Sequence, residues 1–401
     1  MALQDSYYYN TTNSGTADYL SKSFAGQLMR TAPNGMCPLF GLTSMLPSGT
    51  CTAVEHGYFT KAMVFPSVQL NGAIANGVAT TFTVDSTDNI IAGQLLRANT
   101  TGEVVRVTSV DSSTQLTVKR GVGQVAAAAI ADDVKLYSIG NAFEQGSNAP
   151  ASRLMNPTRV INHTQIFRNT WALPGTMTAI APIVGNSLVA ESRQDCASFH
   201  GADIETALIF GQKSGQTVNS QYLTTMSGIV EHVRSLAPVG NTSTASSTTN
   251  YTQLQTMVNG VFDTQTNGRN GNRRIMLCGG NARSVINDIG RLSGDYTIVE
   301  GQTTFGLQFQ SFRTSRGEFK LIEHPMLNSN DDWKKMALVV DMDSVRVPHL
   351  RKTSNFEYGM DGRYVASGQD AVGGTLTTEL TMEVINPSAF AVIYGLTAGA
   401  A

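Results

Sequence analysis

The sequence predicts an α+β fold that carries an inserted small all-β module, and three observations support this class. Residues 184–211 form the longest stretch with helical rather than alternating periodicity and without proline. Residues 67–140 contain short strand-like runs separated by turn-rich pieces. Residues 217–375 mix helical and strand-like segments. A long helix therefore separates a region of arms and strands from a compact mixed region.

The first 50 residues lack a hydrophobic core of their own. We expect an extended arm over residues 1–16, and the spacing of Leu20, Phe24 and Leu28 predicts one short amphipathic helix. Prolines then interrupt the backbone repeatedly. Such a segment either wraps around a neighbouring subunit or lies on its own subunit, and the sequence favours neither.

Residues 67–140 are predicted to form a separate β module, either a small barrel or a sandwich. Asp88-Asn89, the stretch 99–102 and the stretch 111–113 supply the turns, and AAAAI at 126–130 is expected to be a turn or a short helix. Polar, extended segments at 51–66 and 141–178 flank the module, which predicts a two-stranded arm with the module at its tip. The predicted strands are FTVDS, QLLRA, EVVRVTSV, QLTVKRG and DVKLYSI.

Arg153, Arg159 and Arg168 are spread along the second flanking segment. A groove for nucleic acid also mixes arginine with aromatic residues. The segment has only the aromatic pair Phe167 and Trp171, and the whole chain has 28 Lys and Arg against 30 Asp and Glu. We therefore favour ion pairs between subunits, although one exposed pair contributes little.

The long helix is bounded by Pro182 before it and by Gly211 at its end. We expect one bulky and one small-residue side, so that the helix packs between two layers. Arg193, between these sides, is expected to tolerate replacement. The bulky side comprises Val184, Leu188, Phe199, Ala202 and Ile209, and the other side comprises Ala190, Ala197, Gly201, Ile204 and Leu208.

The mixed region begins after the helix. Residues 238–250 form a flexible loop by composition, and Asn250 is the expected N-cap of the helix that follows. A long strand and a short apolar tail close the chain at 376–396. In chain order we also expect helices at 226–236 and 251–262, a buried strand at 273–280, a short helix at 282–289, a hairpin turning at 315–317, and a strand ending near Asp341.

Composition excludes several classes of protein. Only 14% of the residues are charged and the net charge is −2, which argues against a nucleic-acid binder with a basic surface. No run of 18 apolar residues exists, so no membrane contact is expected, and the first residues lack the pattern of a secretory signal. The four scattered cysteines have neither metal-ligand nor redox spacing, which predicts free thiols.

No group of residues predicts a catalytic, cofactor or metal site. CGGN at 278–281 has the position of a phosphate-binding loop but lacks the lysine, so a tight turn is favoured. Asp341 and Asp343 could bind a divalent cation together with Glu323, yet carboxylates at strand ends are usually solvated. The six histidines are isolated, and no nucleophile motif occurs. The sequence predicts no enzyme.

Four segments, in their order, carry a resemblance to a known family. They are AVEHGYFTKAM in the first arm, RVINHTQIFRNTWALPGT before the long helix, DIETALIFG at its end, and the closing RTSRGEFKLIEHPML, ALVVDMDSVRVPHLR and TELTMEVINPSAFAVIYGL. The chain resembles the major capsid proteins of tailed bacteriophages, which have the Hong Kong 97 fold, and most of all a short-tailed-phage subgroup with an inserted β module. GQLLRANTTGEVVRVTSVDSSTQLTVKRGVG also resembles a β module frequent in phage structural proteins. Together these segments cover most of residues 51–396.

The resemblance implies a division of the chain. It assigns residues 1–50 to an N-terminal arm, 51–66 and 141–178 to an extended loop that reaches over a neighbour, and 67–140 to an inserted β module. It assigns 179–219 and 376–401 to a peripheral domain with the long helix as its spine, and 220–375 mainly to an axial domain.

The resemblance also implies a function. The chain would self-assemble as hexamers and pentamers into the icosahedral head shell of a tailed bacteriophage, without a cofactor. Its partners would be itself, portal, scaffold and decoration proteins, and double-stranded DNA held inside by non-specific contact. It would be located in the virion after assembly in the bacterial host cytoplasm. The expected inter-subunit contacts are Glu55, Lys61, Arg153, Arg159 and Arg168; nothing around Lys61 suggests covalent crosslinking.

Two alternatives remain at this point. A tail tube or fibre base would share the Thr- and Gly-rich strands but would not need the long helix. An enzyme with an unrecognised site is disfavoured because no catalytic group of residues is found.

Overall fold

A computed structural model describes most of the chain and divides it into two compact units. Residues 59–160 form one unit, called the module here, and residues 1–58 with 161–401 form the other, called the body. The arm expected at 1–16 and the helix expected around Leu20–Leu28 lie outside the described residues. The structure describes residues 37–44, 49–61, 65–150, 152–153, 156–180, 182, 187–246, 249–263, 272–292, 303–304, 307–308, 310–359 and 370–397.

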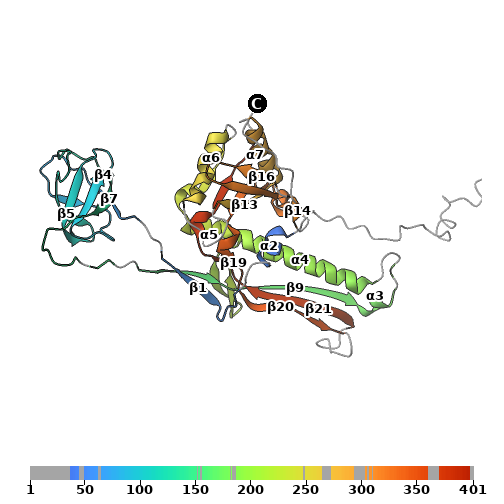
Figure 1. Cartoon of the computed structure of the whole chain (residues 1–401). Coiled ribbons are helices and arrows are strands. Elements are labelled where there is room, and N and C mark those ends of the chain that lie inside the picture. The colour runs from blue at the N-terminus through green and yellow to red at the C-terminus, as the bar shows by residue number, and fades with distance from the viewer. Residues whose placement is uncertain are drawn as a thin grey trace, which may run out of the picture. The chain divides into compact units, whose positions relative to one another are not determined.

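The longest described helix, α4 (Leu188–Phe210), organises the body (Figure 1). The Ser187 side chain accepts a hydrogen bond from the Ala190 N–H and caps its start, and the Gly211 N–H bonds the Ala207 carbonyl at its end. The helix predicted at 184–211 is therefore present but begins at Leu188, where the serine rather than the preceding proline sets the boundary.

A three-stranded antiparallel sheet lies along α4. Residues 165–174, expected in the extended loop, instead form an edge strand of this sheet. Residues 349–358 and 371–375, expected mainly in the axial domain, also belong to it. Their register explains this, because β21 pairs over its whole length with the residues before α4. The strands are β20 (His349–Tyr358), β21 (Ala371–Leu380) and β9 (Gln165–Pro174), in that order.

A second, mixed sheet forms the other half of the body, with six strands among the described residues. One face packs with α4 and α5 (Ile229–Leu236), and the opposite face packs with α6 (Tyr251–Asn259) and α7 (Gly280–Leu292). Asn250 caps α6 in a full capping box, as predicted. The strand order is β12 (Thr242–Thr244), β23 (Ala391–Tyr394), β18 (Ala337–Val340), β13 (Arg273–Cys278), β17 (Glu318–Glu323) and β16 (Gln310–Arg313).

Two strands of this sheet bear on the sequence-based expectations. Residues 391–394, expected in the peripheral domain with the long helix, form β23, which pairs with β18 on one side and β12 on the other. Residues 242–244 were expected in a flexible loop, but they form β12. The polar composition of this loop concealed the strand because β12 is short and lies at the sheet edge, where side chains stay partly exposed.

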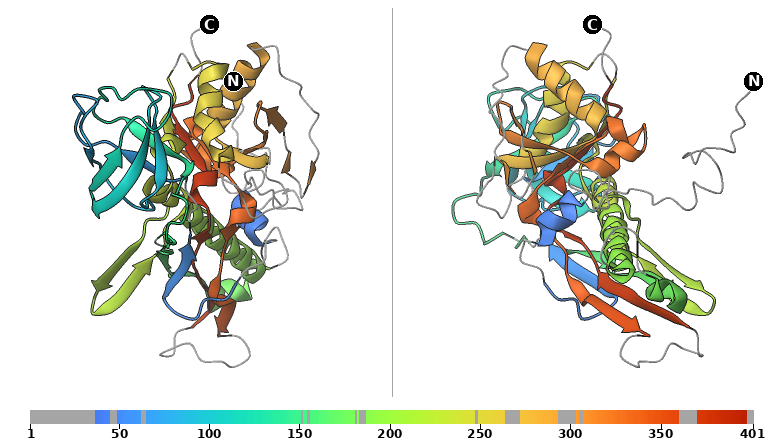
Figure 2. Two further views of the ribbon diagram at one scale, coloured as in Figure 1. Left: turned by 60° about the vertical axis from the view of Figure 1, so that its left-hand side comes forward. Right: turned by 90° about the vertical axis from the view of Figure 1, so that its right-hand side faces the viewer.

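Short elements complete the body (Figure 2). The hairpin β10–β11 turns at Asn219 and Ser220, both with positive φ, as in a type I′ turn. A ribbon of β1 and β8 contains both points at which the chain passes between body and module. These elements are α2 (Pro38–Ser44), β1 (Glu55–Thr60), β8 (Thr158–His163), α3 (Gly175–Ala179), β10 (Ser214–Val218), β11 (Gln221–Thr225), β14 (Thr303–Thr304), β15 (Leu307–Gln308), β19 (Val345–Arg346) and β22 (Glu383–Val384).

The module is a closed β-barrel within residues 65–150, all of which the structure describes. An antiparallel bridge between Leu70 and Val84 joins its first and last strands and closes the sheet. Closure surrounds one hydrophobic core and leaves no long open sheet edge. The strand order is β2 (Ser67–Gln69), β7 (Lys135–Asn141), β4 (Gln94–Ala98), β5 (Val104–Ser112), β6 (Gln115–Lys119) and β3 (Thr81–Thr83).

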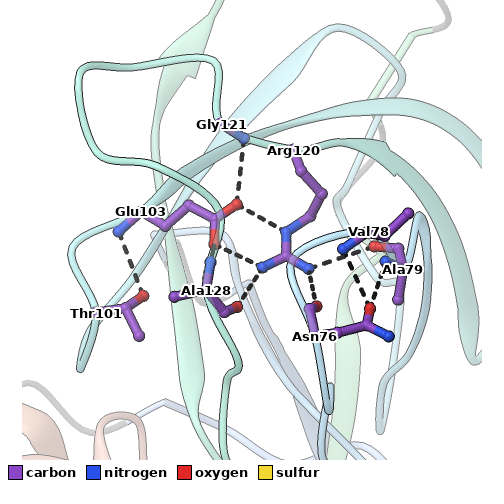
Figure 3. A network of polar contacts seen from close by, with 8 residues as sticks. All are labelled: Asn76, Val78, Ala79, Thr101, Glu103, Arg120, Gly121 and Ala128. Atoms are coloured by element: carbon purple, nitrogen blue, oxygen red, sulfur yellow. Dashed lines mark hydrogen bonds and ion pairs between the residues drawn. The ribbon is translucent and has the colours of Figure 1, made fainter.

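A buried ion pair in the module joins Glu103 and Arg120 (Figure 3). The guanidinium donates from Nε and Nη2 to the two carboxylate oxygens, at 2.7 Å each. Burial alone raises the pKa of the Glu103 carboxyl, but hydrogen bonds from Arg120 and from the Ala128 and Gly121 N–H groups outweigh it, so the pKa is lowered. The carboxylate is thus held ionised inside the module.

The exposure of α4 corrects the expected two-sided packing. Phe199 is 66% exposed and Ala197 is also exposed, whereas Ile204, Leu208 and Ile209 are buried. The three-stranded sheet presents the polar side chains of Asn169 and Thr378 to the middle of the helix. His200, rather than a bulky apolar residue, contacts them. Thus Phe199 is not a core residue.

We expect Ile204→Ala to lower the free energy of unfolding of the unassembled chain by about 2–5 kcal/mol, because it leaves a cavity in the main core. Phe199→Ala is the matched control and should change it by less than about 0.5 kcal/mol, as exposed substitutions do. Denaturant unfolding measures both. Equal losses would show that Phe199 is buried.

Glu103→Ala should destabilise the module by about 3–5 kcal/mol, since it leaves the Arg120 charge buried without its partner. Arg106→Ala is the control: its partner Glu144 is 64% exposed, so the loss should stay below about 1 kcal/mol. Because the folded state lowers the pKa of Glu103, the wild-type contribution should be complete above the ordinary glutamate pKa and should fade as pH falls below it. Unfolding followed by amide exchange from pH 7 to pH 3 tests this.

Candidate assembly surfaces

The root of the β1–β8 ribbon is held by side chains of β1. The imidazole of His56 contacts the carboxylate of Glu383, and the Tyr58 hydroxyl donates to the carbonyl of Val384. Burial and the nearby Glu383 charge raise the pKa of the Tyr58 hydroxyl, so it remains a donor. Alternation along β1 directs these two side chains inward and leaves Glu55 and Phe59 exposed.

Asn162 fixes β8 from inside the body. Its Oδ1 accepts the Ser227 N–H at 2.8 Å, and its Nδ2 donates to the carbonyls of Ser227 and Met382 at 3.1 and 2.8 Å. His232 Nε2 lies 3.4 Å from the same Nδ2. Burial, reinforced by the Lys213 charge, lowers the pKa of His232 to about 4, so this ring is neutral at pH 7.

Glu379 ties the ribbon root to the three-stranded sheet. Its carboxylate accepts from the Thr164 hydroxyl at 3.0 Å and from Arg351 Nε at 2.6 Å. Thr381 donates to the carbonyl of His163 at 2.8 Å. Such directional bonds fix the orientation of the body residues of the ribbon, which apolar packing alone does not.

His200 joins the middle of α4 to two strands of the sheet. Its Nδ1 lies 2.7 Å from Asn169 Oδ1 and its Nε2 lies 2.7 Å from Thr378 Oγ1. Asn169 in turn donates to Asp203 at 2.8 Å, which turns its oxygen toward the imidazole. Burial lowers the pKa of His200, and the Asp203 charge opposes this only in part.

Arg193 fastens the N-terminal half of α4. It pairs with Glu357 on β20 at 2.6 Å, and its guanidinium lies 5.3 Å from the centre of the Trp171 ring. A side chain at Gly374 would meet the Trp171 indole at 2.7 Å, so the glycine admits the ring. Helical spacing alone did not show these contacts of Arg193, because β20 is distant in sequence; that Arg193 tolerates replacement stays a prediction.

Glu205 connects α4 to α2 and to the six-stranded sheet. Its oxygens accept the backbone N–H groups of Leu39 and Phe40 at 2.7 and 2.6 Å, and His324 Nε2 lies 2.7 Å away. Both side chains of the Glu205–His324 pair are fully buried. Residues 38–44, expected in an arm, therefore lie on their own subunit with Leu39 in the core.

The predicted inter-subunit residues lie at exposed positions. Glu55 and Arg159 are on the ribbon strands, and Lys61 and Arg153 are in the module near its connections. Arg168 projects from β9 on the face opposite α4, beside the half-exposed Ile166. The structure does not gather these residues into one site.

Sequence reasoning missed the buried polar residues Asn162, Glu205 and Glu379. One local signal pointed to Glu205, which lies between Ile204 and Leu208 on an otherwise apolar helix face. Asn162 and Glu379 gave no such signal, since their partners are distant in sequence.

The carboxylates considered for a cation have other partners. Asp341 accepts from the Ser344 hydroxyl at 2.6 Å and faces Arg274 at 3.9 Å, and burial raises its pKa. Glu323 pairs with Arg283 at 3.2 Å. In the part of the chain that the structure describes, no three His, Cys, Asp or Glu residues are grouped to hold a metal, and no helix has the length and apolar character for crossing a membrane.

Comparisons with known proteins identify relatives over almost the whole chain. The profile of the SU10 major capsid protein family matches residues 6–397. The major capsid protein of Pseudomonas phage PaMx41 is 38% identical over 387 residues, which cover 94% of this chain and 92% of that protein.

Solved capsid structures are similar at lower identity. The capsid of cyanophage P-SCSP1u matches with a TM-score of 0.48 at 9% identity, over 99% of each chain. The capsid of a native GTA particle matches with a TM-score of 0.49 at 6% identity, over 96% of this chain and 98% of that one. At these values the matches add nothing to the family profile.

The depressed pKa of His232 predicts an acid-sensitive body. The unfolded chain binds a proton at this residue near pH 6.5 and the folded chain only near pH 4, so stability should be complete above pH 6.5 and decline as pH falls toward 4. Protonation of His232 alone should lower the free energy of unfolding by about 3 kcal/mol. His232→Gln should flatten the unfolding free energy between pH 6.5 and 4 relative to wild type. An unchanged slope would contradict the assignment.

Proposed function

Since the chain belongs to the SU10 major capsid protein family, we propose that its copies assemble as hexamers and pentamers into an icosahedral head shell around double-stranded DNA. The protein is the major capsid protein of a phage, forms the capsid shell and is part of the virion. Its role is structural rather than enzymatic. Family membership also sets aside the tail-tube and fibre-base alternative.

The β1–β8 ribbon is the part of the chain that we propose to cross to a neighbouring subunit. The observation that carries this is its anchored root: Asn162, Glu379 and Tyr58 hold the body end of the ribbon, while the outward residues of β1 stay exposed. A strand pair held so firmly at one end and exposed along one side suits a contact with another copy. The proposed charged contacts are Glu55, Lys61, Arg153, Arg159 and Arg168, the last on the adjoining sheet.

The remaining partners follow from the same role. A shell filled with DNA needs an entry vertex and a size-determining assembly aid, so portal and scaffold proteins are proposed partners, with decoration proteins outside. The net charge of −2 supports only non-specific contact with packaged DNA, because tight phosphate binding requires a basic surface. We place assembly in the host cytoplasm.

Charge reversal at the ribbon and its adjoining sheet tests the proposal. Arg159→Glu and Arg168→Glu should impair shell formation while the unassembled chain melts within about 1 °C of wild type, because exposed charges contribute under about 0.5 kcal/mol to folding. Rising salt should weaken wild-type assembly too, since charges are screened beyond about 8–10 Å. Electron microscopy of the purified protein measures closed shells.

Asp331→Lys serves as the matched control, because it reverses an 88% exposed charge beside the six-stranded sheet. It should assemble like wild type. Normal shells from both arginine variants would remove these residues from the interface, whereas tubes from the wild-type chain would contradict the shell itself.

A further inference from the structure

The buried ion pair of the module holds two long loops rather than the barrel strands. Arg120 donates to the carbonyls of Asn76, Ala79 and Ala128, at 3.1, 3.4 and 2.6 Å. Figure 3 shows these carbonyls converging on one guanidinium. The Glu103 carboxylate receives the Ala128 N–H from the second loop. The two loops, residues 71–80 and 121–130, are thereby clamped against each other.

The clamped loops approach closely and cannot move apart freely. A side chain on Gly77 would lie 2.6 Å from the carbonyl oxygen of Ala127, so only glycine permits the approach. Ile74 and Ile130 also exchange backbone hydrogen bonds of 2.8 and 2.9 Å between the loops. Burying a charge pair is costly, and here it fixes irregular backbone at one surface. Rigid loops on a stable scaffold are the usual form of a binding surface.

This surface, which we call the loop face, is uncharged and exposes three valines. Residues 71–80 and 121–130 contain no Asp, Glu, Lys or Arg. Val78 is 82% exposed, and Val122 and Val125 are more than 40% exposed. A hollow of about 300 Å³ lies at the first loop, lined by residues 71–76 with Ala79, Thr81 and Thr83. Exposed apolar side chains without charges are typical of the centre of an interface.

The same module carries a second exposed apolar surface, which we call the aromatic face. Phe65 is 88% exposed, and Tyr137 and Ile139 are 45% and 53% exposed. The Ser138 N–H bonds the Pro66 carbonyl, and Tyr137 pairs with Ser67, so these residues are neighbours. The aromatic face is thus a group of neighbouring, exposed, large side chains.

The two faces are complementary in apolar character and in charge. The exposed valines of the loop face offer apolar contact to the large exposed side chains of the aromatic face. The exposed Asp132 borders the loop face, where it accepts the Gly72 N–H, and the exposed Arg97 pairs directly with Tyr137 in the aromatic face. Because the barrel is closed, contact with it must use side chains and loops rather than strand pairing.

We propose that the aromatic face of one copy docks on the loop face of a second copy. This inference rests on the proposed shell, which brings many copies together, and it names a surface outside the ribbon. A contact between two different faces is heterologous, so successive copies extend it into a ring or a chain.

Protection of a cysteine at the loop face tests the proposal in shells assembled from the purified full-length chain alone. Val125→Cys should react readily with a maleimide in the unassembled chain and about tenfold or more slowly in shells, a factor that corresponds to about 1.4 kcal/mol. Ser113→Cys, in the exposed β5–β6 turn, is the matched control and should react equally in both. Cys51, Cys196 and Cys278 are buried, and the wild-type chain gives the background.

Adding Phe65→Ser to the Val125→Cys chain tests whether the aromatic face of a second copy is what covers the loop face. Protection should disappear in shells of this double variant. Protection that persists would overturn the assignment of the aromatic face. Equal reactivity in shells and in the unassembled chain would overturn the contact, as would protection already present before assembly. Protection that appears only after other virion proteins are added would assign the loop face to one of them.

Disulfide trapping tests the contact between the two faces without requiring that shells assemble. Chains carrying Val125→Cys and chains carrying Ile139→Cys, mixed under mild oxidation, should form a mixed dimer more readily than either chain mixed with Ser113→Cys. If no shells form but the mixed dimer does, the proposed function fails and the contact stands. If shells form and the mixed dimer does not, the contact fails and the shell stands.

Discussion

One buried carboxylate, that of Glu205, determines how the parts of the body meet. It lies on α4, yet its donors come from α2 and from His324 beyond the end of β17. A buried carboxyl group is tolerated only when hydrogen-bonding partners surround it, so the loss of a partner is costly. The position of α2, the C-terminal half of α4 and one end of the six-stranded sheet are therefore mutually dependent.

The two halves of α4 are held by different kinds of interaction, apolar packing in one and polar contacts in the other. Ile204, Leu208 and Ile209 pack in the main core, which contributes most of the stability but fixes no orientation. Arg193 and His200 bind specific atoms of the three-stranded sheet, which fixes orientation at little net gain in stability. The ribbon root repeats the second arrangement through Asn162 and Glu379. Directional polar contacts thus specify the geometry of the surfaces that we assign to assembly.

The sequence predicted the features whose causes are local. Most strands and turns of the module, the long helix with Gly211 at its end, the hairpin turning at 315–317 and the Asn250 cap each depend on residues a few positions apart. It did not predict that residues 165–174 form a sheet strand. The polar character of 141–178 as a whole suggested an arm, while Asn169 on the inner face of the strand has its partner His200 31 residues away. The Glu205 contacts span 119 and more residues, so no pattern of neighbouring residues revealed them.

The pairing of β1 with β8 explains how a whole module is accommodated in a ribbon. The chain leaves the body in one of these strands and returns in the other, and the two are hydrogen-bonded neighbours. An insertion there must only bring its own two ends together, and the cost of closing a loop grows slowly with its length. The module meets this condition because β2 pairs with β7, which brings residues 66–69 beside residues 135–138. The Leu70–Val84 bridge then closes its sheet and the Glu103–Arg120 pair holds its loops. None of these contacts uses a residue of the body, so changes on the outward faces of the module leave the Glu205 contacts of the body untouched.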